Sequence, residues 1–132
     1  MIREAENLFR QGVGEINLVG QDTTAYGDDL GIEHGLPTLL ERLATIEGAG
    51  WIRFLYVYPN RVTQRLLDTV ALHEPVCNYI DIPLQHASPR VLKRMKRGSS
   101  GDSFLKLVER IRRTIPSVAV RTSFIVLSLI HI

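Results

Sequence analysis

Five polar residues stand at the ends of short apolar runs, and their types suit one kind of ligand. Gln21 and Asp22 follow the first run, Gln85 follows the third, and Arg121 and Ser123 lie in the fourth. Asp22 can accept a hydrogen bond from an ammonium group, and Arg121 can bind a carboxylate. Gln85 and Ser123 can contact ribose hydroxyls or an adenine edge. The set predicts a site for a zwitterionic, nucleoside-like ligand; the alternative is that Asp22 opens a turn and Arg121 is a solvated strand residue.

His86 and Cys77 are the other residues whose chemistry invites a role. A histidine can be a catalytic base or a metal ligand, but no second ligand stands at metal-binding spacing from His86. We therefore favour a structural, hydrogen-bonded histidine and predict no metal site. Cys77 precedes a β-prone run in apolar company, which is typical of an inert buried thiol. No residue is assigned as catalytic.

A basic cluster follows the third run. Two interpretations stay open: a solvated helix face, or contact with ribosomal or transfer RNA. The cluster comprises Arg90, Lys93, Arg94, Lys96 and Arg97.

Helical and strand patterns alternate along the chain, and these elements must position the polar residues. β-prone runs cover residues 15–20, 51–58, 79–84 and 118–126, with helical spacing of apolar residues between them. Thr63 can cap the helix that follows it, and Ser88-Pro89 predicts a helix start with a side-chain cap. Strands separated by helices of this length form a parallel sheet, so the fold class is α/β. Ligands of such folds bind at the carboxyl ends of the strands. Four strands are too few for a closed eight-stranded barrel, which leaves an open doubly wound sheet or a section of a larger barrel.

Composition places the chain among ordinary globular proteins. It has 132 residues, 45% hydrophobic and 23% charged, with a formal net charge of +2. One cysteine excludes an internal disulfide framework and any self-contained cysteine cluster for iron–sulfur or zinc. Neither a secretory signal nor an apolar run of about 20 residues is visible, so we expect a cytoplasmic protein.

Several blocks of the sequence resemble the methylthiotransferases of the radical S-adenosylmethionine superfamily. They occur in the family's order and with its spacing. These blocks are Gln21-Asp22-Thr23-Thr24-Ala25-Tyr26-Gly27, Tyr56-Val57-Tyr58-Pro59, the run from Tyr79 to Pro89, the run from Val91 to Arg97, and Arg121-Thr122-Ser123-Phe124-Ile125-Val126.

Two branches of that family differ at the first and third strand ends. The transfer-RNA branch typically has Gln-Asn-Val and Pro-Val-Gln-Ser-Gly-Ser, whereas this chain has Gln21-Asp22-Thr23 and Pro83-Leu84-Gln85-His86-Ala87-Ser88. The chain is therefore similar to the RimO-like branch, which adds a methylthio group to an aspartate of ribosomal protein S-twelve. The transfer-RNA branch and a non-catalytic α/β RNA-binding module remain as alternatives.

The resemblance implies a fold and a chemistry. It implies a partial (βα)₆ barrel in which these strands are the second to fifth, and a 4Fe-4S cluster that cleaves S-adenosylmethionine to a radical. A second cluster helps to deliver sulfur. Gln21, Asp22, Gln85, Arg121 and Ser123 would line the S-adenosylmethionine pocket. The expected partner is ribosomal protein S-twelve or the small ribosomal subunit, without a membrane.

The match also has limits. The family binds its radical-generating cluster through three cysteines upstream of the blocks found here, and Cys77 lies outside that motif. Residues 1–126 are expected to be part of a radical S-adenosylmethionine core domain, and 127–132 an atypical tail from a truncated or misread coding end. The alternative is that 127–132 are a genuine apolar extension. We therefore expect a fragment that does not ligate the clusters and is inactive alone.

Overall fold

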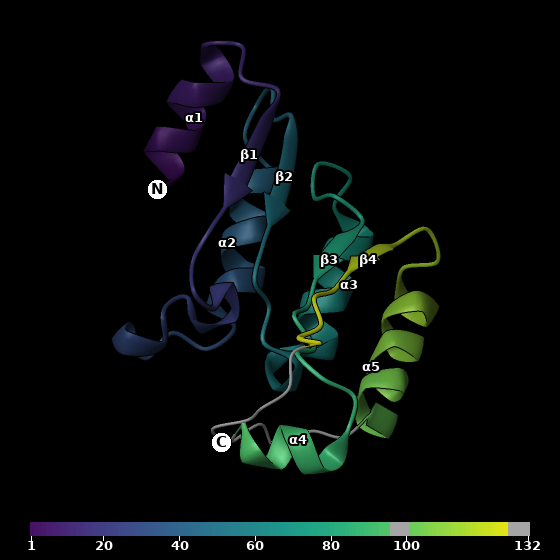
Figure 1. Ribbon diagram of the computed structural model, residues 1–132. Coiled ribbons are helices and arrows are strands. Elements are labelled where there is room, and N and C mark those ends of the chain that lie inside the picture. Colours follow the sequence, from purple (N-terminus) through teal and green to yellow (C-terminus); the bar gives the residue numbers. More distant parts are fainter. Residues whose placement is uncertain (96–100, 127–132) are drawn as a thin grey trace.

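A computed structural model describes residues 1–95 and 101–126, in which helices and strands alternate (Figure 1). Residues 96–100 and 127–132, including Lys96, Arg97 and the predicted tail, lie outside the described residues. No helix within the described ranges is long and apolar enough to cross a bilayer. The elements are α1 (Ile2–Arg10), β1 (Glu15–Leu18), α2 (Gly35–Ala44), β2 (Trp51–Phe54), α3 (Gln64–Leu72), β3 (Tyr79–Asp81), α4 (Pro89–Arg94), α5 (Gly101–Thr114), β4 (Ala119–Arg121) and the 3₁₀ turns η1 (Thr23–Ala25), η2 (Asp28–Leu30) and η3 (Pro59–Arg61).

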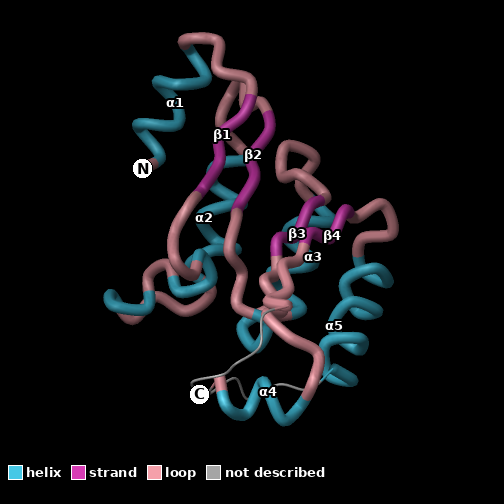
Figure 2. Tube along the Cα trace, viewed as in Figure 1, coloured by secondary structure: helices cyan, strands magenta, loops and turns pink. Residues whose placement is uncertain are grey.

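The described strands pair in parallel and in chain order. Strands β1 and β2 form one pair and β3 and β4 another, seen as two short magenta pairs in Figure 2. The two pairs meet at a seam: the Cys77 N–H donates to the Ile52 carbonyl at 2.9 Å, and the Val57 N–H donates to the Asp81 carbonyl at 2.9 Å. Parallel pairing with helical crossovers, as predicted from the sequence, is therefore confirmed.

Helices cover one face of the strands. Figure 1 shows α2 and α3 on the same side of the strands, and α1, α2, α3 and α5 contact one another in chain order. Successive side chains of a strand point to opposite faces. On β2, accordingly, Ile52 and Phe54 are fully buried whereas Arg53 between them is only half-buried. The strands thus have an apolar face beneath the helices and a polar face opposite it.

The core lies between this apolar face and the helices. Its fully buried side chains come from strands and helices alike, so burial of apolar area holds the two layers together. They include Leu40, Leu43, Ile52, Phe54, Leu67, Ile80 and Ile111.

Of the two residues predicted to cap helices, Thr63 does so with its side chain and Ser88 does not. Thr63 caps α3 as predicted, because its Oγ1 accepts the Leu66 N–H at 3.1 Å. Ser88 precedes α4, but its side chain makes no capping hydrogen bond. Instead the Ser88 N–H donates to His86 Nδ1 at 2.9 Å. The predicted side-chain cap at Ser88 is therefore wrong, although the helix begins at Pro89.

The described strands are shorter than the β-prone runs. Residues 51–58 predict one strand, but β2 ends at Phe54. Tyr56 has a φ of 58°, in the left-handed region, and a residue in that conformation cannot continue a pleated strand. Only after this turn does Val57 pair with β3.

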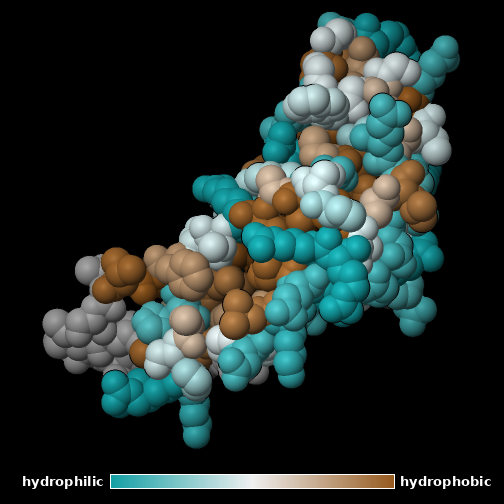
Figure 3. Space-filling view, turned by 90° about the vertical axis from the view of Figure 1, so that its right-hand side faces the viewer, coloured by the Kyte–Doolittle hydropathy of each residue, from teal (hydrophilic) through white to brown (hydrophobic). Residues whose placement is uncertain are grey.

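Apolar surface gathers in a band on the side of the molecule that carries α5 and β4 (Figure 3). Exposed apolar patches of this kind often mark contact surfaces. The large apolar side chains exposed on α5 and after β4 are Leu105, Phe124, Ile125 and Val126.

Two leucines of α3 provide a matched test of this packing. Leu67 is 0% exposed and Leu72 is 79% exposed. We expect Leu67→Ala to lower the free energy of unfolding by about 2–5 kcal/mol, because it leaves a cavity against the strands. Leu72→Ala is expected to change it by less than about 0.5 kcal/mol. Urea unfolding followed by circular dichroism measures both; equal losses would contradict the described orientation of α3.

Candidate functional site

Three of the predicted site residues meet at the carboxyl ends of β3 and β4. The Gln85 N–H donates to the Ser123 carbonyl at 2.9 Å, and the Ile125 N–H donates to the Gln85 carbonyl at 2.7 Å. Gln85 has a φ of 70°, a left-handed conformation that is uncommon for a residue with a side chain. Arg121 ends β4 two residues before Ser123. The structure therefore brings the main chains of Gln85 and Ser123 together at this edge, with Arg121 on the adjoining strand β4.

Gln21 and Asp22 lie at the end of β1, across β2 from that group. Gln21 is exposed. Asp22 opens η1: its Oδ1 accepts the Thr24 N–H at 3.0 Å and also the Thr24 hydroxyl. Asp22 therefore does open a turn, as the alternative interpretation holds, and it uses the oxygen Oδ1 to do so. A loop held in this way presents the carboxylate in a fixed position at the sheet edge.

The end of β2 connects these two groups. The Thr23 hydroxyl donates to the Leu55 carbonyl at 2.8 Å, and the Thr23 N–H donates to the Tyr56 carbonyl at 3.2 Å. On the other side, the Tyr56 N–H donates to Asp81 Oδ2 at 3.2 Å. Backbone groups that leave a strand ladder need other partners, and here Thr23 and Asp81 provide them.

A second contact holds the loop after β1. Arg61 Nη1 of η3 lies 2.6 Å from Asp28 Oδ2 of η2. The Arg61 guanidinium, which hydrogen-bonds the Asp28 carboxylate, holds the pKa of that carboxyl below its usual range. The segment that follows Asp22 is therefore tied to the segment that follows β2.

Asp81 is a buried carboxylate at this edge that the sequence interpretation missed. It is 3% exposed, and its Oδ2 lies 3.8 Å from Arg121 Nη1. The Tyr79 hydroxyl, and then the Asp81 carboxylate, raise the pKa of Arg121. The Arg121 side chain is nevertheless 57% exposed, so its guanidinium can still meet a ligand. A carboxylate between two isoleucines of an apolar strand was the signal available in the sequence.

The polar face carries a further set of charged contacts below the strand ends. Arg53 Nε lies 2.6 Å from Glu15 Oε1, and its guanidinium lies 4.5 Å from the centre of the Tyr79 ring. The hydrogen bond that Arg53 donates to the Glu15 carboxylate raises the pKa of Arg53. These contacts join β1, β2 and β3 on the face that the helices leave uncovered.

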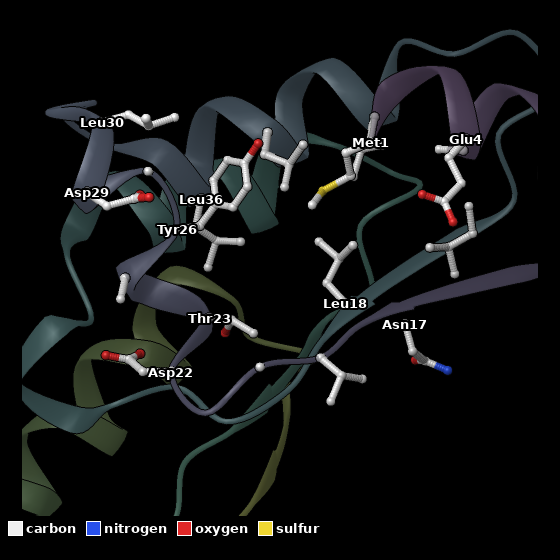
Figure 4. A pocket seen from close by; sticks show the side chains of 18 of the residues that line it. Met1, Glu4, Asn17, Leu18, Asp22, Thr23, Tyr26, Asp29, Leu30 and Leu36 are labelled. Atoms are coloured by element: carbon white, nitrogen blue, oxygen red, sulfur yellow. The ribbon is translucent and has the colours of Figure 1, made fainter.

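A cleft of about 720 Å³ lies beside β1, between α1, α2 and the loop that contains Asp22. Figure 4 shows Asp22 and Asp29 toward one end and Glu4 toward the other, with Leu18 and Leu36 between them. Of the predicted site residues, Asp22 alone lines this cleft. The cleft is therefore separate from the group at Gln85, Arg121 and Ser123.

His86 makes a local hydrogen bond, and the basic side chains of α4 are exposed. His86 Nδ1 accepts the Ser88 N–H at 2.9 Å, which is the hydrogen-bonded role expected of it. Arg90, Lys93 and Arg94 of α4 are exposed. Their exposure is compatible with a solvated face and with an anionic partner.

Cys77, which the sequence predicts to be a buried thiol, is only half-buried, with Arg53 and Glu15 near it. Burial raises the pKa of the Cys77 thiol, and Arg53 opposes this only in part. Within residues 1–95 and 101–126, no three His, Cys, Asp or Glu side chains are close enough to hold a metal ion. An iron–sulfur cluster needs several thiolates, and this single, mostly protonated thiol does not meet that need.

Comparisons with known proteins agree with the blocks found in the sequence. The model of the radical SAM superfamily matches residues 1–129. A relative from Solibacter usitatus, named ribosomal protein uS12 methylthiotransferase RimO, is 68% identical over 128 residues. Relatives of the same name from Koribacter versatilis and Alkaliphilus oremlandii are 59% and 50% identical. These matches cover 96% of this chain and confirm the predicted resemblance.

The chain spans between 25% and 29% of the length of these three relatives. Among solved structures, the radical S-adenosylmethionine methyltransferase TsrM from Kitasatospora setae, with cobalamin and a 4Fe-4S cluster bound, is similar with a TM-score of 0.66. The two are 16% identical, and the likeness covers 93% of this chain and 24% of that one. At this identity the likeness concerns the fold.

The surroundings of Cys77 generate a testable prediction. Because burial raises the pKa of the thiol, less thiolate is present at neutral pH, and we expect the pH–rate profile for iodoacetamide to have its midpoint above that of the urea-unfolded chain. Mass spectrometry of timed samples gives both profiles. A folded-state midpoint at or below the unfolded one would show that Arg53 outweighs burial.

Proposed function

Because the chain belongs to the radical SAM superfamily, we propose that it is part of a methylthiotransferase that adds a methylthio group to an aspartate of ribosomal protein S-twelve. One observation carries this proposal: the relatives that are 68%, 59% and 50% identical over nearly the whole chain are all named ribosomal protein uS12 methylthiotransferase. The sequence Pro83-Leu84-Gln85-His86-Ala87-Ser88 supports the same branch against the transfer-RNA branch.

The strand arrangement supports a section of a partial (βα)₆ barrel. Parallel strands that neighbour one another in chain order, with helices α2 and α3 on one side, are typical of a barrel wall. A doubly wound sheet has helices on both faces. In this proposal β1 to β4 are the second to fifth strands of the barrel, and their carboxyl ends surround its site.

S-adenosylmethionine is the ligand that the strand-end residues suit. Its carboxylate would meet Arg121, whose guanidinium is largely exposed, and its ammonium group would meet Gln21 and Asp22. Gln85 and Ser123 would contact its adenosine part. Together with a reduced 4Fe-4S cluster, the ligand supplies the radical chemistry. The residues of this chain bind and orient it.

The cluster itself is not assigned to this chain. A cluster that cleaves S-adenosylmethionine is held by cysteine thiolates, and the chain has Cys77 alone. We therefore propose that other parts of the whole enzyme hold the iron, and that this chain by itself is inactive.

A cytoplasmic ribosomal substrate fits the charge of the exposed helix α4. We propose that Arg90, Lys93 and Arg94 approach the small ribosomal subunit, whose RNA is anionic. Lys96 and Arg97 belong to the same basic run but lie outside the described residues. The relatives are the observation that favours a protein substrate over transfer RNA.

Binding of S-adenosylmethionine tests the assignment of Arg121. We expect the chain to bind it weakly, and Arg121→Ala to weaken binding about tenfold or more, because a charged hydrogen bond to the carboxylate is lost. Isothermal titration calorimetry measures the affinity. Arg113→Ala, the same charge change at an exposed site on α5, is the matched control and should bind like the unchanged chain. Equal effects of the two variants would refute the role of Arg121.

A chimera tests the activity. Residues 1–126 replace the corresponding segment of the Solibacter usitatus relative, to which the chain is 68% identical. The reconstituted chimera is given ribosomal protein S-twelve and, separately, transfer RNA. We expect mass spectrometry to find a methylthio group on an aspartate of the protein and none on the nucleic acid. If the chimera modifies transfer RNA instead, the chain belongs to the transfer-RNA branch of the family.

A further inference from the structure

The buried carboxylate of Asp81 stands at the centre of a set of contacts that crosses all of the described strand ends. Its Oδ2 accepts the Tyr56 N–H at 3.2 Å and lies 3.8 Å from Arg121 Nη1. Asp81 is 3% exposed, and a buried carboxylate is stable in such a place only when its oxygens are paired or hydrogen-bonded. The contacts with Tyr56 and Arg121 meet that requirement for Oδ2.

The contact with Tyr56 extends to the loop after β1. Tyr56 has a φ of 58°, a conformation that costs free energy for a residue with a side chain and persists when its surroundings hold it. Asp81 holds the N–H of Tyr56, and Thr23 donates to its carbonyl. Thr23 directly follows Asp22, whose carboxylate caps η1. The position of the Asp22 loop therefore depends on the turn at Tyr56.

The contact with Arg121 acts on the other side. At 3.8 Å the carboxylate attracts the guanidinium, which also contacts the Tyr79 hydroxyl, and the guanidinium remains 57% exposed. Asp81 is too buried to bind a ligand itself, so its influence must pass through its neighbours.

We propose that Asp81 is a positioning residue: its carboxylate fixes the left-handed turn at Tyr56 and holds Arg121, so that the Asp22 loop and Arg121 keep one arrangement at the strand ends. This inference rests on the proposed function for its ligand, S-adenosylmethionine. It assigns the recognition of the ligand's carboxylate to a pair, Arg121 in contact and Asp81 behind it.

Two substitutions separate the two contacts of Asp81. Asp81→Asn keeps an amide oxygen that can accept the Tyr56 N–H but removes the charge that attracts Arg121. Asp81→Ala removes both contacts. Asp68→Asn and Asp68→Ala, at an exposed aspartate of α3, are the matched controls.

Two ligands separate positioning of Arg121 from a general loss of structure. S-adenosylmethionine carries the carboxylate, and 5′-methylthioadenosine lacks it. By calorimetry we expect Asp81→Asn to weaken binding of S-adenosylmethionine about tenfold and to leave 5′-methylthioadenosine within about twofold. Asp81→Ala should weaken both, and the Asp68 variants neither. Equal weakening of both ligands by Asp81→Asn, or no weakening of either, would overturn the inference.

Amide hydrogen exchange by NMR tests the turn without any ligand. We expect Asp81→Ala to speed exchange at Tyr56 and Thr23 about tenfold or more, and Asp81→Asn to leave Tyr56 protected. Unchanged exchange in Asp81→Ala would overturn the inference whatever the ligands do. Absence of binding by the unchanged chain, with exchange as expected, would count against the proposed function and leave the positioning of the turn in place.

Discussion

Parallel pairing in chain order is the constraint on which the rest of this structure depends. A parallel neighbour can be reached only by a crossover, and crossovers between adjacent parallel strands are right-handed in nearly all proteins. When each strand pairs with its predecessor, this rule brings successive helices to the same face. The apolar residues Ile52, Phe54 and Ile80 are buried on that face. Charged side chains such as Glu15 and Arg53 are left to the other.

The same constraint brings the polar strand ends to one edge. There the buried carboxylate of Asp81 contacts both Tyr56 after β2 and Arg121 of β4. The main chain of β2 departs from its ladder after Phe54, and the resulting backbone groups are held by Thr23 and Asp81. Left-handed conformations at Tyr56 and Gln85 occur at two neighbouring strand ends. Non-glycine residues in this region cluster at functional sites in proteins, and here they accompany the residues assigned to the ligand.

Element types could be predicted well from the sequence because their signals are local. The hydroxyl of Thr63 and the ring of Pro89 act on the next turn of the chain, and both precede or begin helices as expected. Strand ends could not be predicted, because β-prone side chains continue to Tyr58 while the end of β2 is decided by the distant Asp81. The residue types of the site could be predicted from the sequence. Their separation into one group at the end of β1 and another at the ends of β3 and β4 could not, because it depends on how the strands pair. The burial of Asp81 and the half-exposure of Cys77 depend on it too.

The close approach of the main chains where β1 and β2 begin limits how this protein can vary. The Trp51 N–H donates to the Gly14 carbonyl at 2.8 Å, and a Cβ added at Gly50 would lie 2.2 Å from that same oxygen. Any larger residue at position 50 would push the two backbones apart next to the first paired residues of β1 and β2, Glu15 and Trp51. During sequence divergence even the smallest side chain at position 50 therefore requires a backbone shift, while Gly12, with open space around it, is limited only by its positive φ.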